Sequence, residues 1–130
     1  MLVHLLKSKL HRATVTAASL DYEGSLTIAE DLLERAGLHP YERILCGNMA
    51  NGARWETYAI RGSAGSLDVI INGAGAHLIH KGDKVIVAAF VLTDEGIKPK
   101  YILVNDDNAF DAWLVGGGPL GLEAPESPKE

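Results

Sequence analysis

The sequence predicts a small β-barrel, closed or nearly closed, with one or two short helices. Short segments rich in β-branched and aromatic residues recur along the chain, and turn-forming residues separate them. One clear stretch repeats its apolar residues at helical spacing. The chain has 130 residues, of which 47% are apolar, so it can bury one core without disulfides or metal. These observations favour a single, mainly β domain.

The clearest helix is predicted over about residues 28–36. Thr27 followed by Glu30 matches the capping-box pattern at a helix start. Gly37 is a typical residue just beyond a helix end. The apolar face of this helix is expected to consist of Ile28 or Ala29 together with Leu32, Leu33 and Ala36.

The remaining elements are predicted to be strands, each bounded by turn-forming residues. Asn51-Gly52 is a strong hairpin signal, so the segments on either side of it should pair. Residues 84–92 are continuously apolar, which predicts a strand buried on both faces. The expected strands cover residues 9–16, 42–49, 54–60, 67–71, 84–92 and 99–104.

The bulk properties point to a cytoplasmic protein. The net charge of −5 argues against a nucleic-acid partner, and no apolar run approaches the length of a membrane span. Cys46 is the only cysteine and lies in an apolar stretch, so we expect a buried, unreactive thiol in a reducing compartment. The domain is predicted to cover residues 1–115, and the Gly- and Pro-rich segment 116–130 is expected to be a flexible tail.

The pair Gly24-Ser25 carries the first candidate chemistry. A serine hydroxyl can attack the carbonyl of the preceding residue, and glycine there allows backbone conformations that other residues avoid. Elimination of the resulting ester leaves a dehydroalanine, which hydrolysis converts to a pyruvoyl group. Gly-Ser is also a common pair in turns, so these two residues alone are equally compatible with an ordinary turn that carries no chemistry.

Five motifs together resemble the aspartate 1-decarboxylase family, in matching order from the N-terminus to about Val104. They are Lys9-Leu-His-Arg12, Tyr22-Glu-Gly-Ser25, Asn51-Gly52 with Thr57-Tyr58, Asn72-Gly-Ala-Gly-Ala-His77 and Gly82-Asp83. The resemblance implies a six-stranded double-ψ β-barrel that assembles as a homo-tetramer with sites between subunits. It also implies decarboxylation of L-aspartate to β-alanine and CO₂, which feeds pantothenate and coenzyme A synthesis.

The resemblance further implies self-cleavage between Gly24 and Ser25, giving chains 1–24 and 25–130. A pyruvoyl group made from Ser25 would then be the covalent cofactor, whose ketone holds the electrons left on Cα by decarboxylation. Tyr58 is implied as the catalytic proton donor to that carbon. Part of the family needs a maturation factor for cleavage, which makes such a protein a candidate partner.

Two cations are candidates for binding the substrate carboxylates. Arg54 lies four residues before Tyr58, so both point to the same face of a strand. A guanidinium can hold a carboxylate by two parallel hydrogen bonds. Lys9 is the second candidate. Which carboxylate each would bind stays open, although the β-carboxylate is the more useful anchor because the α-carboxylate leaves as CO₂.

The resemblance assigns further roles around the substrate. Thr57 would contact substrate and polarise the scissile carbonyl. Gly73-Ala74-Gly75 would offer backbone N–H groups to a carboxylate. Asn72 would align groups for self-cleavage, and His11 would lie near the site. Gly75 departs from the commonest family pattern, in which alanine stands at this position, and we expect a more flexible loop here.

Structural interpretations of these residues also remain. A strand tyrosine, solvated strand cations and a turn-capping asparagine would explain most of them, in which case the chain is an uncleaved, inactive β-barrel binding module. No metal is expected, because His77 and His80 have no carboxylate or cysteine near them in the pattern. Trp55 and Trp113 are predicted to lie in the core or at an interface.

Overall fold

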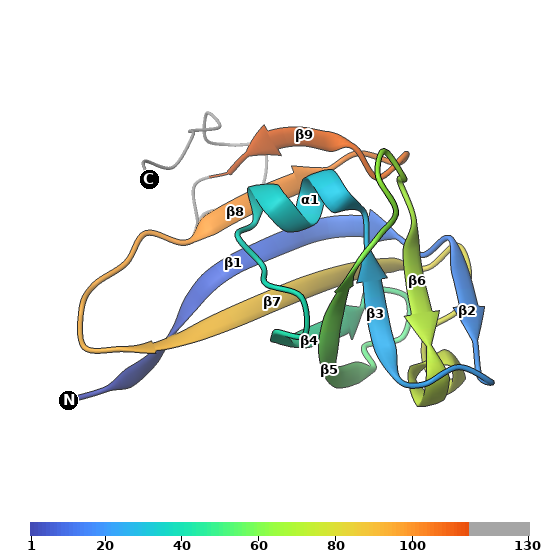
Figure 1. Ribbon diagram of the computed structural model, residues 1–130, viewed down its shortest axis with the longest axis horizontal. Helices are drawn as coiled ribbons and strands as arrows, with labels where there is room; N and C mark the ends of the chain where they lie inside the picture. Colours follow the sequence, from blue (N-terminus) through green and yellow to red (C-terminus); the bar gives the residue numbers. More distant parts are fainter. Residues whose placement is uncertain (115–130) are drawn as a thin grey trace.

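The computed structural model describes residues 1–114 and is mainly β, which confirms the predicted fold class (Figure 1). The expected tail, 116–130, lies outside the described residues. Within them, no helix reaches the length and apolar content that crossing a membrane would require. The elements are β1 (Val3–Thr14), β2 (Ala17–Ser19), β3 (Ser25–Ile28), α1 (Glu30–Arg35), β4 (Arg43–Asn48), β5 (Arg54–Arg61), β6 (Val69–Asn72), the 3-10 helix η1 (Gly73–His77), β7 (Lys84–Thr93), β8 (Lys100–Val104) and β9 (Phe110–Trp113).

The nine strands are hydrogen-bonded in the order β2-β6-β3-β5-β4-β7-β1-β8-β9. Three pairs are parallel, namely β1 with β8, β2 with β6 and β3 with β5, and the others are antiparallel. The long strands β1 and β7 lie side by side, and α1 covers the space between them and the β3–β5 pair (Figure 1). The ladders within residues 1–114 end at β2 and β9, so closure into a six-stranded double-ψ barrel stays a prediction.

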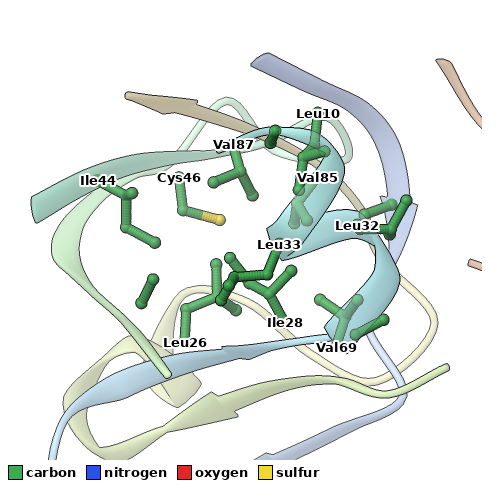
Figure 2. Close-up of a cluster of buried hydrophobic side chains, with 14 of the residues drawn as sticks. Leu10, Leu26, Ile28, Leu32, Leu33, Ile44, Cys46, Val69, Val85 and Val87 are labelled. Atoms are coloured by element: carbon green, nitrogen blue, oxygen red, sulfur yellow. The ribbon is translucent and has the colours of Figure 1, made fainter. Parts of the chain in front are cut away.

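The core lies between α1 and the inward faces of the central strands (Figure 2). Leu32 and Leu33 of α1 pack there with side chains from β1, β3, β4, β6 and β7. Cys46 belongs to this cluster, and its burial raises the pKa of the thiol to about 12. The prediction of a buried, unreactive thiol is therefore confirmed. The labelled members are Leu10, Leu26, Ile28, Leu32, Leu33, Ile44, Cys46, Val69, Val85 and Val87.

The predicted start of the helix was wrong. Residues 25–28 form strand β3, which is hydrogen-bonded to β5 on one side and β6 on the other, and the helix begins only at Glu30. Thr27 does not cap it; Ala29 occupies the cap position without a side-chain hydrogen bond. Pairing on both edges of β3 has overridden the local helix pattern. The predicted helix end is confirmed, because Gly37 follows it with a φ of 67°.

Most predicted strands are present, with corrected limits. The Asn51-Gly52 hairpin joins β4 to β5, as predicted. The first strand begins earlier than residue 9, at Val3, and the short strands β2 and β9 were not predicted. Burial of β7 on both faces was wrong. The first half of β7 alternates, and beyond it Phe90 and Leu92 are 47% and 53% exposed, because this end extends past the core beside the N-terminal end of β1.

Asn108 ties three distant segments together. It is buried and adopts a φ of 63°, which asparagine tolerates better than most residues. Its Oδ1 accepts a hydrogen bond from Thr14 N (2.7 Å), and its Nδ2 donates to Thr14 O (2.8 Å) and Leu67 O (2.9 Å). The side chain thus joins the end of β1 to the segment before β6 and to the turn between β8 and β9.

Replacing Asn108 with alanine should therefore destabilise the fold. Asn108→Ala removes three part-buried hydrogen bonds to the backbone of Thr14 and Leu67, and we expect the free energy of unfolding to fall by ~2–4 kcal/mol. Urea denaturation would measure this. The neighbouring exposed side chain provides the control: Asp107→Ala should change stability by less than about 0.5 kcal/mol. Equal effects of the two substitutions would contradict the assignment.

Candidate active site

The candidate site is built around Ser25, the first residue of β3. Asn72 of β6 is its direct antiparallel partner. On the other side, Leu26 pairs with Ala59 of the parallel strand β5, and continuing this register by one residue places Tyr58 beside Ser25. Leu26 and Ala59 face the core, so the alternation of a strand puts Ser25 and Tyr58 on the opposite face. Asn72, Ser25 and Tyr58 therefore form a row across three adjacent strands.

The Asn72 side chain holds the Ser25 hydroxyl. Its Nδ2 donates to Ser25 Oγ (3.0 Å) and to Thr27 Oγ1 (3.2 Å). Ser25 is only 7% exposed, yet it borders an open hollow of about 390 Å³ that Tyr22, Glu23 and Asn72 also line. The hydroxyl accepts the bond from the amide and keeps its own proton to donate. The site thus combines a positioned oxygen with access for a small molecule.

Gly73 lies in direct contact with the segment before Ser25. Its φ is +80°, and a Cβ built on it would lie 2.8 Å from Gly24 Cα and 2.9 Å from Tyr22 O. Both conformation and space thus require glycine at 73. Gly24 is not among the glycines with positive φ, and a Cβ on it would come no closer than 4.0 Å to Asn72 O. The backbone freedom expected at Gly24 is instead used at Gly73.

The turn η1 presents its N-terminal end beside Ser25. Asn72 precedes the turn but does not cap it, because its amide is bonded to Ser25 and Thr27 instead. The bonds of a 3-10 helix join residues three apart, so the N–H groups of Gly73 and Ala74 have no partner within this turn, whereas that of Gly75 reaches the carbonyl of Asn72. Ala74 is exposed, whereas Gly73 and Gly75 are buried.

The side chains of Asn48 and Asp83 hold the segment that follows the turn η1. Asn48 Nδ2 donates to Leu78 O (3.1 Å) and to Asp83 Oδ2 (2.8 Å), and His80 N donates to the same carboxylate oxygen (2.9 Å). These bonds, with that from the His80 backbone first, lower the pKa of Asp83. The expectation that no carboxylate lies near His80 was wrong, since Asp83 Oδ2 is 3.8 Å from His80 Nδ1. Within residues 1–114, however, no three metal-ligating side chains cluster.

Arg54 and Thr57 lie on opposite faces of β5. Arg54 pairs with Gly47, and a Cβ built on Gly47 would lie 2.9 Å from the guanidinium Nη1. No carboxylate within residues 1–114 forms an ion pair with Arg54, so its charge is available to a ligand. Thr57 pairs with Ile44 of β4, on the opposite face from Arg54.

Tyr58 has an aromatic neighbour that sequence reasoning missed. The rings of Tyr41 and Tyr58 lie 6.2 Å apart, although Tyr41 belongs to the loop before β4. Tyr41 has a φ of 70°, which is uncommon for a bulky residue. Its backbone N–H donates to Ala59 O (2.7 Å), which places it against β5. Nothing local in the sequence signals this pairing.

Lys9 and His11 form a separate group on β1. Lys9 Nζ lies 5.1 Å from the centre of the Tyr101 ring, and the His11 ring lies 6.5 Å from it. His11 is buried, and its Nδ1 finds no hydrogen-bond partner in the described part of the chain. Burial, followed by the charges of Lys9 and Arg12, lowers the pKa of His11, so the ring is neutral at pH 7.

The structure does not join this group to Ser25. Three strands, β5, β4 and β7, stand between β3 and β1 in the sheet. Within residues 1–114, no hydrogen bond, ion pair or ring contact links Lys9 or His11 to Ser25, Asn72 or Tyr58. Trp55 and Trp113 are partly buried against the core, which confirms the prediction for these two residues.

Comparisons with known proteins agree with the motifs. Residues 1–111 match the family described as aspartate decarboxylase. The aspartate 1-decarboxylase of Caldicellulosiruptor saccharolyticus is 50% identical over 112 residues, covering 83% of this chain and 88% of the relative. That of Sulfurimonas denitrificans is 46% identical over 118 residues, covering 88% and 98%. That of Burkholderia cenocepacia is 51% identical over 110 residues, covering 81% and 86%.

Two costs of a side chain at Gly73, the steric overlap with Gly24 and the strain of a left-handed backbone, can be measured separately. Gly65 has a similar φ of +73°, but a Cβ there would meet nothing within 4 Å. Gly65→Ala should therefore cost only about 1 kcal/mol of stability, for the strained backbone alone. Gly73→Ala should cost about 2 kcal/mol more, because the methyl group overlaps the backbone of Gly24. Thermal unfolding would measure both, and equal costs would contradict the close contact.

Proposed function

The chain belongs to the aspartate decarboxylase family, and on that premise we propose that it converts L-aspartate to β-alanine and CO₂ for pantothenate and coenzyme A synthesis. The observation that carries the proposal is the placement of Ser25. Its hydroxyl is held by Asn72, it lies next to Gly24, and it borders a hollow that a small substrate can enter. The catalytic domain is taken as residues 1–115.

We propose that the chain first cleaves itself between Gly24 and Ser25. The Ser25 hydroxyl adds to the Gly24 carbonyl carbon, the Gly24–Ser25 C–N bond breaks, and an ester replaces the amide. Elimination of the ester frees the Gly24 carboxylate and leaves dehydroalanine at position 25. Water then replaces its nitrogen, which leaves as ammonia, and a pyruvoyl group results. The bond from Asn72 to Ser25 Oγ supports a role of Asn72 in aligning the hydroxyl, and Thr57 is the proposed residue that polarises the scissile carbonyl.

The surroundings of Ser25 fit a small ketone at this position. Residue 25 is buried, the Asn72 amide can donate to an oxygen there, and the hollow beside it is open to a substrate amine. The pyruvoyl group, once formed, supplies an acceptor for the electrons of the broken Cα–carboxylate bond. Tyr58 is the proton donor in this proposal, which is supported by the neighbouring pair Leu26 and Ala59, one residue further along β3 and β5.

The charges of the site suit a dicarboxylate. Arg54 is exposed and unpaired within residues 1–114, and it shares the Tyr58 face of β5. We assign it to the β-carboxylate, which stays with the product. The N–H groups of Gly73-Ala74-Gly75 and the Lys9 ammonium are the candidates for the remaining contacts, and His11 stands beside Lys9.

We propose that a homo-tetramer completes the site. Lys9 and His11 lie away from Ser25 within one chain, so a neighbouring copy would have to supply them. Large apolar side chains are exposed on β1, β4 and β7, which supports a contact surface there. They are Val3, Leu45, Phe90 and Leu92. A cytoplasmic location agrees with the single buried thiol, and a maturation factor for cleavage remains a candidate partner.

The intact mass of the denatured protein tests the proposed function. We expect two species, residues 1–24 and residues 25–130, with the larger one lighter by one ammonia than a serine-started chain. This sample should release CO₂ from L-aspartate. Ser25→Ala should remain at full length and be inactive, because it has no hydroxyl to attack Gly24. Full-length wild-type protein that stays uncleaved after long warm incubation would instead mean that a maturation factor is missing or that the chain is an inactive binding module.

Removing the Arg54 guanidinium tests substrate recognition. Arg54→Ala should raise the KM for aspartate roughly ten- to a hundredfold, because a charged hydrogen-bonding partner of the substrate is lost. Self-cleavage should be unaffected. The control is Arg61→Ala at the other end of β5, where Arg61 pairs with Glu30 and Glu34, and its KM should not change. Unchanged affinity in Arg54→Ala would rule out the assignment.

A further inference from the structure

The indole of Trp55 is in close contact with the backbone of Gly75. A Cβ built on Gly75 would lie 2.5 Å from Trp55 Cε2 and 2.6 Å from both Cδ2 and Cζ2. Real Cβ atoms do not approach other atoms so closely, and the opposing atoms belong to a rigid ring. Gly75 is not among the residues with positive φ, so its backbone would accept alanine. Space against the indole, and not conformation, therefore requires glycine here.

The turn η1 is consequently held between two contacts. At its start, Gly73 lies against the backbone of Gly24, where a Cβ would come within 2.8 Å. Two residues later, Gly75 lies against Trp55, which the alternation of β5 places on the same face as Thr57. A five-residue 3-10 helix between two such contacts has little room to move in either direction.

We infer that Trp55 is a positioning residue that holds the turn Gly73–His77 against the Gly24-Ser25 segment, and that Gly75 provides the space its indole needs. This inference rests on the proposed function. Trp55 acts through the turn: it fixes the backbone beside the bond to be cleaved and the N–H groups that would bind a substrate carboxylate. A methyl group at 75 would push the turn off the indole and disturb both.

Leucine at position 55 offers a compensating change. The side chain of leucine ends at Cδ, so two of the three opposing ring atoms, Cε2 and Cζ2, have no counterpart. Trp55→Leu should thus make room for alanine at 75. A purely structural tryptophan can be distinguished with Trp113→Leu, since Trp113 is also partly buried against the core but lies on β9, with its ring tilted against that of Phe110.

The experiment compares Gly75→Ala, Trp55→Leu, the double variant Trp55→Leu/Gly75→Ala and Trp113→Leu. The readouts are thermal unfolding, the rate at which fragment 1–24 appears by intact mass, and the KM and kcat for aspartate. Gly75→Ala should slow fragment release roughly tenfold or more and raise KM, because reacting groups tolerate little displacement. The double variant should recover to within about threefold of wild type in both, because leucine at 55 and the methyl group at 75 together restore the contact. Trp55→Leu alone should slow fragment release, because it leaves the turn without its contact on β5. Trp113→Leu should lower the melting temperature without changing either.

Several results would overturn the inference. One is normal fragment release and KM in Gly75→Ala. Another is a double variant that is no better than Gly75→Ala. If Gly75→Ala alone fails to fold, the double variant still decides, because it must then fold and release the fragment. Wild-type protein that releases no fragment even when a maturation factor is supplied would refute the proposed function instead, whereas cleaving wild type without rescue in the double variant refutes only the role of Trp55.

Discussion

The contact between Gly73 and the backbone of Gly24 is the constraint on which the rest of the site depends. It brings a turn against the segment before β3 at a distance that no side chain at 73 would allow. Asn72, one residue earlier, is thereby directed at Ser25 Oγ, while Gly75, two residues later, meets the Trp55 indole. One left-handed glycine thus sets the geometry of a hydroxyl, an amide and a row of backbone donors together.

Hydrogen bonds between strands, and not strong ion pairs, hold the backbone around Ser25 in place. Ser25 starts a strand that is bonded on both edges, so its backbone is fixed before any chemistry begins. The ion pairs of the described residues lie mainly on exposed side chains and contribute little to stability. Arg54, by contrast, forms no ion pair with a carboxylate of residues 1–114, so the core and not the surface charges determines stability.

Turn and helix-end signals in the sequence were reliable where the backbone conformation itself requires a particular residue. The hairpin turn at Gly52 and the helix end at Gly37 both use a left-handed φ that favours glycine, 75° and 67°, and both are present. The start of the helix was misplaced because residues 25–28 carry a helical pattern and also suit a strand. Hydrogen bonding to β5 and β6 decided between the two, and these strands come much later in the chain.

The sequence by itself determined the mainly β class, the buried thiol and the set of motifs that mark the family, because composition, periodicity and motif order are properties of the chain alone. Only the tertiary structure decided that Gly73 rather than Gly24 uses the freedom of glycine, that Trp55 occupies the space beside Gly75, and that Lys9 stands apart from Ser25. Each of these depends on which distant segments come into contact, and close packing, rather than local preference, fixes those contacts.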